Sequence, residues 1–198
     1  VFMFNWTAFG GGVFNFNGSP AFTNSVFWKN WAPFGGAAIW STSAASRPEI
    51  TNCDIVANQS LGAGGNGGGI YIDSGSVAVA NSILWFNTSD VGTIEDQQIF
   101  GALAADVSHS NIQGLADLFG NNNIGDDPNF VDYLGGELRL SVGSPSIGTA
   151  NAAALPADAG DLDQDDDILE QLPLDFDLVP RVSGTVDMGP YESAFPDP

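Results

Sequence analysis

Short apolar stretches separated by polar bends repeat along the first half of the chain. Segments 10–30, 35–58 and 67–87 share one plan: a glycine cluster, an apolar strand, a polar bend, a second strand, then Asn, a small residue, a third strand and another Asn. No helical period accompanies this plan. Three short strands in a period of just under thirty residues are typical of a solenoid whose parallel strands stack about 4.8 Å apart. We therefore predict an all-β parallel β-helix of about four coils.

Each copy of the repeat carries two asparagines, six residues apart. The first members are Asn24, Asn52 and Asn81, and the second members are Asn30, Asn58 and Asn87. Successive copies are 28 and 29 residues apart, so a further first member is expected near position 111, where Asn111 stands. Because a buried amide needs hydrogen-bond partners, we predict that these residues stack as ladders that bond the coils above and below.

The alternation of side chains along each strand sorts the remaining positions into rows. The predicted inward rows are Phe22/Ile50/Val79, Ser25/Cys53/Ser82 and Phe27/Ile55/Leu84, and the predicted outward row is Val26/Asp54/Ile83. Counting back from Asn111 places His109, the only histidine, in the row of Val79 as a core or half-buried side chain. Trp28 and Trp85 share an outward row, where their rings would stack on sugars, contact a neighbouring chain or pack under a loop.

Charge divides the chain into two parts. It has 24 acidic and 4 basic residues and a net charge of −20, yet its first 89 residues hold only three acids and two bases. This composition excludes nucleic-acid binding, and it disfavours anionic membranes and polyanionic sugars, because those partners need Lys and Arg. No stretch is apolar enough to span a bilayer. We assign residues 1–120 to the coils and 121–198 to an irregular acidic cap of the same domain.

One segment of the acidic part has metal-ligand character. Alternating aspartates can converge on a hard cation such as Ca²⁺, which takes six to eight oxygen ligands. The candidate ligands are Asp161, Asp163, Asp165, Asp167 and Glu170. The fit to an EF-hand loop is partial, so the segment is either a calcium site or a solvated acidic loop.

Groups that carry enzyme chemistry are scattered through the repeat. Its ionisable side chains are Asp54, Asp73, Glu49, Lys29 and Arg47, and no two acids recur at a spacing that places them on adjacent coils. No Gly-x-Ser-x-Gly motif accompanies the single histidine. We therefore predict no catalytic site and no enzymatic activity.

Several motifs support a family resemblance. Gly-Gly-x-Ile followed by Phe-x-x-Asn resembles the repeat of polymorphic outer-membrane proteins and other secreted right-handed parallel β-helix proteins. Segments 110–114, 123–132, 138–145 and 186–192 are similar to the C-terminal end of bacterial surface β-helix proteins described as choice-of-anchor or "probable pectate lyase" proteins. The resemblance implies a right-handed coil and an exported protein, either secreted or attached to the cell surface.

These observations favour a structural or adhesive module. The first coil would leave Val1, Phe2 and Phe4 on an exposed apolar edge, which we expect to be covered by a neighbouring copy or by upstream coils of the same precursor. Such pairing would build a larger fibre or layer. The alternative is a lyase, a hydrolase or a carbohydrate-binding module that acts on neutral glycans.

Overall fold

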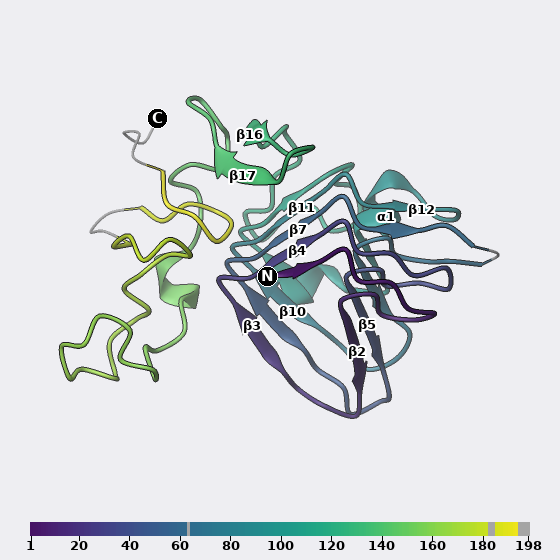
Figure 1. Ribbon diagram of the computed structural model, residues 1–198, viewed down its shortest axis with the longest axis horizontal. Coiled ribbons are helices and arrows are strands. Elements are labelled where there is room, and N and C mark those ends of the chain that lie inside the picture. Colours follow the sequence, from purple (N-terminus) through teal and green to yellow (C-terminus); the bar gives the residue numbers. More distant parts are fainter. Residues whose placement is uncertain (63, 182–184, 194–198) are drawn as a thin grey trace.

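The computed structural model describes residues 1–62, 64–181 and 185–193. It is a β-solenoid of about four turns, built almost entirely from parallel strands (Figure 1). The predicted fold class is therefore confirmed. One short helix, α1 (Ile94–Gln98), and two 3₁₀ turns, η1 (Ala104–Asp106) and η2 (Ala152–Ala154), interrupt the described strands.

Three parallel sheets run along the solenoid, and each turn contributes one strand to each of them. Sheet 1 contains β1 (Phe2–Met3), β4 (Val26–Trp28), β7 (Asp54–Val56), β11 (Ile83–Trp85) and β15 (Asn111–Ile112). Sheet 2 contains β3 (Ala21–Thr23), β6 (Glu49–Thr51), β10 (Ala78–Ala80) and β14 (Val107–Ser108). Sheet 3 contains β2 (Val13–Phe16), β5 (Ile39–Thr42), β9 (Ile70–Ile72) and β13 (Ile99–Phe100). The short strands β8 (Gln59–Ser60) and β12 (Thr88–Ser89) pair beside them, and β16 (Phe130–Asp132) and β17 (Glu137–Leu140) form an antiparallel hairpin.

The predicted inward rows fill the solenoid with a single apolar core. Phe22, Ile50 and Val79 pair in sheet 2, and Phe27, Ile55 and Leu84 pair in sheet 1. A row of small polar side chains follows them. The backbone N–H of Cys53 donates to Ser82 Oγ (3.1 Å), and that of Ser82 donates to Ser110 Oγ (3.2 Å). Cys53 is fully buried in this row.

Glycines before the strands of sheet 3 allow a tight turn. Gly36 and Gly67 both have a φ of +54°. A Cβ atom would lie 2.4 Å from the carbonyl oxygen of Ile39 at the first position, and 2.1 Å from that of Ile70 at the second. Since no side chain fits so close to the backbone, the turn explains the repeated glycine cluster.

The bend between sheets 2 and 1 is a single residue in the left-handed region. Asn24, Asn52 and Asn81 have φ values of +46°, +51° and +52°. Asparagine tolerates this conformation better than most residues because its side chain bonds locally. The first asparagine of each repeat is therefore selected by backbone geometry.

The predicted register is wrong in the last turn. Asn111 pairs with Ile83 of sheet 1, and Ser108 pairs with Ala80 of sheet 2. The bend position equivalent to Asn81 is consequently held by His109, whose φ is +46°. Histidine is another residue enriched in this conformation, so it replaces asparagine there. Val107, not His109, occupies the inward row of Val79.

The second asparagines form the predicted buried ladder. Asn5 Nδ2 donates to Asn30 Oδ1, Asn30 Nδ2 to Asn58 Oδ1 and Asn58 Nδ2 to Asn87 Oδ1, each at 2.9 Å. Every one of these oxygens also accepts the backbone N–H of the asparagine that donates to it. Gln98 of α1 ends the row, because its Oε1 accepts from Asn87 Nδ2 at 2.8 Å.

The first asparagines do not form a comparable ladder. Asn81 Nδ2 lies 3.3 Å from Asn52 Oδ1, but their other partners belong to the C-terminal region. Asn24 Nδ2 donates to the carbonyl of Leu174 (2.9 Å), and Asn81 Oδ1 accepts from the backbone N–H of Asn151 (2.8 Å). Because their side chains point outward from the bend, they fasten the C-terminal region to the solenoid.

The C-terminal region lies along the side of the solenoid (Figure 1). The outward face of sheet 1 and the C-terminal region enclose a second apolar cluster, which includes Val26, Val56, Ile83, Trp85, Leu138, Leu140, Ile147 and Met188. The far end of the first core is covered by Leu115 and Leu118 instead. Much of the predicted cap is therefore a lateral cover of one sheet.

We predict that Asn58→Ala lowers the free energy of unfolding by about 3 kcal/mol or more, because it leaves several buried N–H and C=O groups without partners. Asn5→Ala is the matched control, since Asn5 is exposed at the start of the same row. Denaturant titration of the two variants measures the difference. Equal losses would contradict an essential buried ladder.

Candidate functional site

The acidic loop of residues 158–170 is folded by its own aspartates. Asp158 is buried, and its Oδ2 accepts the backbone N–H of Leu162 (2.7 Å). Asp161 Oδ1 accepts the backbone N–H groups of Asp165 (3.0 Å) and Asp166 (3.3 Å). These bonds curl the loop and turn several carboxylates toward one another.

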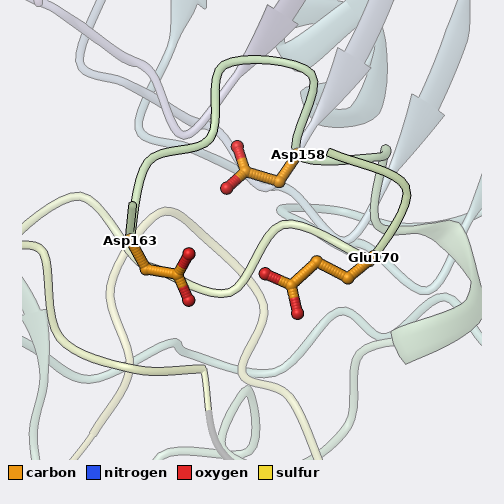
Figure 2. A group of neighbouring side chains, drawn as sticks. All are labelled: Asp158, Asp163 and Glu170. Carbon is orange, nitrogen blue, oxygen red and sulfur yellow. The ribbon is translucent and has the colours of Figure 1, made fainter. Parts of the chain in front are cut away.

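Two groups of three carboxylates are close enough to share a metal ion. One group is Asp161, Asp163 and Asp165, and the other is Asp158, Asp163 and Glu170. Within each group the potential ligand oxygens lie within 4.8 Å of one another. Figure 2 shows the carboxylates of Asp158, Asp163 and Glu170 facing a common space. Asp163 belongs to both groups and is the centre of the candidate site.

Four of the five predicted ligands are therefore brought together. Asp167 is in neither group, and its Oδ1 instead accepts the backbone N–H of Leu169 (3.0 Å). Sequence reasoning missed Asp158, which lies three residues before the run of alternating aspartates. Only the curl of the loop brings it to Glu170, so the spacing of the run gave no signal for it.

Glu170 is the residue whose chemistry favours a cation at this site. Its Oε1 is buried and has no hydrogen-bond partner among the described residues. Desolvation, followed by the charges of Asp165 and Asp163, raises the pKa of its carboxyl group. A bound cation would satisfy the oxygen and offset this repulsion. All the donors are carboxylate oxygens, which suit hard cations.

The predicted tryptophan surface is covered by the C-terminal region. Trp28, Val56 and Trp85 share a row as predicted. Trp85 is 5% exposed, and Trp28 Nε1 donates to the carbonyl of Tyr133 (3.0 Å). Of the three alternatives, the structure therefore shows packing under another part of the chain.

The predicted outward acid Asp54 is buried beneath the same cover. It lies between Val26 and Ile83 in sheet 1, is fully buried, and has no hydrogen bond to either carboxylate oxygen from the described residues. The loop at Gly189 approaches so closely that a Cβ there would lie 2.8 Å from Asp54 Oδ1. Burial raises the pKa of Asp54 well above its usual range, so the group is held protonated.

A buried ion pair holds the end of this cover. Arg181 pairs with Glu192, and its Nη2 also donates to Asn24 Oδ1 (2.7 Å). Burial raises the pKa of Glu192 to about 7, although the charge of Arg181 opposes that shift. The guanidinium thus links the bend of the first repeat to the last described segment.

The other scattered ionisable groups do not meet. Glu49 lies on sheet 2, Asp54 lies under the cover of sheet 1, and Asp73 follows the strand β9 of sheet 3. Arg47 and Glu49 line one shallow hollow with Asp106, and Lys29 lines another beside Tyr133. His109 Nε2 lies 2.8 Å from Asn122 Nδ2.

A surface row of aromatic rings was missed in the sequence. Phe14, Trp40, Tyr71 and Phe100 occupy the same outward position in the four strands of sheet 3. The available signal was an aliphatic residue followed by an aromatic one at the start of each copy: Val13-Phe14, Ile39-Trp40, Ile70-Tyr71 and Ile99-Phe100. It escaped notice because the rows were counted from the asparagines.

Comparisons with protein-family models, curated proteins and solved structures returned no match to this chain. Within the part of the chain that the structure describes, no helix has the length and apolar character needed to cross a membrane.

We predict that the C-terminal cover loosens as the pH rises. Because folding raises the pKa values of Asp54 and Glu192, the folded state binds more protons than the unfolded chain, and stability falls as the pH increases from about 4 through 7. Titratable Tyr191 faces Asp54, and its own pKa is also raised by burial. Thermal melting at pH 5 to 8 measures the effect.

Asp54→Asn keeps a neutral side chain at every pH, so its melting temperature is expected to depend less on pH and to exceed that of the wild type at pH 8. The exposed Asp117→Asn is the control. If Asp54→Asn and the wild type show parallel pH profiles, Asp54 does not carry the dependence.

Proposed function

We propose that this chain is a structural and adhesive module of an exported or cell-surface protein, and that its first turn pairs with a β-turn of another polypeptide. For the isolated chain that polypeptide is a second copy. The supporting observation is the state of the amide ladder at Asn5. Asn30 Oδ1 accepts both N–H groups of Asn5, at 3.1 and 2.9 Å. Asn5 Oδ1 holds the equivalent place in the exposed first turn and accepts no hydrogen bond from the described residues.

Apolar side chains around Asn5 support the same proposal. Phe2 stacks on Phe27 with ring centroids 4.5 Å apart, which continues the core into the first turn. Met3, Phe4 and Trp6 are 51%, 62% and 70% exposed. An edge of this kind, with free backbone groups and exposed apolar side chains, is a template for strand pairing.

The opposite end of the solenoid favours pairing between two first turns. Leu115 and Leu118 close that end of the core, and buried Glu95 accepts the backbone N–H groups of Ala116, Asp117 and Leu118. Since only the first turn has free edges, identical first turns would meet across a two-fold axis.

We further propose that Ca²⁺ is the cation of the acidic loop. The supporting observation is the unpartnered Oε1 of Glu170 among carboxylates that face one another. Three carboxylates offer up to six oxygens, and water completes the six to eight that Ca²⁺ takes. In this proposal calcium stiffens the C-terminal region of a module that works outside the cell.

Self-association tests the first proposal. We expect light scattering and sedimentation velocity to show a dimer that forms with increasing protein concentration. Met3→Lys places a charge on the edge strand β1 and is expected to weaken the dimer. Val131→Lys, at a 57% exposed position on β16, is the matched control and should associate like the wild type. A monomer at every concentration would overturn the proposed pairing.

A calcium titration tests the second proposal. At a free Ca²⁺ concentration a hundred times the dissociation constant, we expect the melting temperature to rise by about 5–10 °C. Asp163→Asn removes the carboxylate shared by both groups and is expected to abolish the rise, whereas exposed Asp90→Asn should retain it. An equal rise in both variants, or none in the wild type, would exclude this site.

A further inference from the structure

The outward face of sheet 3 carries an unbroken row of aromatic rings. Phe14 pairs with Trp40, Trp40 with Tyr71, and Tyr71 with Phe100, one ring on each successive strand. Their ring centroids are 6.3, 4.9 and 5.6 Å apart. The row follows the axis of the solenoid, so it is straight and is held by the same strand register as the core.

Two further rings widen the row near its start. Phe9 packs edge-on against Trp40 with centroids 4.6 Å apart, and Phe34 stacks on Phe9 at 5.2 Å. Phe9, Phe34 and Phe14 are 42%, 45% and 53% exposed. This contrasts with the row of Trp28 and Trp85 on sheet 1, which the C-terminal region covers. The sheet 3 rings are therefore available to a ligand.

A polar row runs beside the rings on the same face. Asp73 Oδ2 accepts from Thr42 Oγ1 (2.8 Å), and Asp73 Oδ1 accepts from the Tyr71 hydroxyl (3.3 Å). These exposed groups offer both donors and acceptors at the border of the aromatic row. A sugar ring needs this combination, because it has an apolar face of C–H groups and a rim of hydroxyls.

We propose that this face binds a neutral glycan in an extended conformation, with its sugar rings stacked along Phe14, Trp40, Tyr71 and Phe100 and its hydroxyls bonded to Asp73, Thr42 and the Tyr71 hydroxyl. This inference rests on the proposed adhesive function and names the ligand of that function.

Charge and size select this ligand. The net charge of −20 and the carboxylate of Asp73 repel uronate or sulfate groups, so a polyanionic sugar is disfavoured. A protein partner would need about 20–30 residues on each side of a stable interface, whereas this face offers a row only one to two rings wide. A linear chain of sugars matches both the width of the row and its length over four strands.

The test uses the whole chain with soluble, uncharged β-1,4-linked oligosaccharides: cellohexaose, xylohexaose and N-acetylated chitohexaose. Calorimetry and tryptophan fluorescence are expected to show saturable binding of at least one of them, and polygalacturonate is expected not to bind. Trp40→Ala should weaken binding by about tenfold or more, as expected for a central aromatic anchor. Tyr71→Phe, which keeps the ring and removes the hydroxyl, should cause a smaller loss.

Trp6→Ala is the matched control, because Trp6 is exposed and stacked on Trp31 at 5.4 Å but lies outside the row. Its glycan affinity should equal that of the wild type. Should Trp40→Ala fail to fold, Phe14→Ala tests the same row from its exposed edge.

Absence of binding to all three oligosaccharides, or equal binding by the Trp40, Phe14 and Trp6 variants, would overturn the inference. The molar mass of the same samples is measured in parallel. Loss of glycan binding with the dimer intact refutes the glycan site alone, whereas a monomer that still binds glycan refutes only the pairing of first turns.

Discussion

The row of buried amides formed by Asn30, Asn58 and Asn87 sets the register on which the other rows of the solenoid depend. Each side-chain oxygen accepts two N–H groups from the preceding turn, and each side-chain nitrogen donates to the next turn. A turn shifted by one residue would bury these groups without partners and would also turn its apolar side chains outward. The ladder therefore makes one alignment of the turns far more stable than its neighbours.

A fixed register gives the sheets outer faces that serve different purposes. On sheet 1, the row of Val26 and Ile83 and the row of Trp28 and Trp85 form an apolar face, and the C-terminal region buries it. On sheet 3, the rings of Trp40 and Tyr71 stay at the surface beside polar groups. The same device, one residue type repeated at one position, thus yields a packing surface on one side and a candidate binding surface on another.

Local repetition explains which features could be predicted from the sequence. The inward rows, the ladder of second asparagines and the exposure of Val1 and Phe4 follow from a period that any three copies reveal. The last turn was misaligned because an asparagine at 111 fitted the spacing as well as the histidine at 109, and the sequence does not show which of them has a positive φ. The bonds from Asn24 to Leu174 and from Asn81 to Asn151 join residues 150 and 70 positions apart, and no periodic pattern encodes them.

The distribution of charge separates the solenoid from its cover in their response to the surroundings. The turns are held by amides, hydroxyls and apolar side chains, which do not titrate near neutral pH. The cover contains most of the acids and the two remaining arginines. Arg181 is paired with Glu192, and Arg139 lies between Glu137 and Asp177. With both guanidiniums engaged, the remaining repulsion must be relieved by protons, as at Asp54, or by a cation, as proposed for the loop around Asp163. The cover is therefore the part of the molecule in which pH and metal ions act, while the register of the rod and its aromatic face persist.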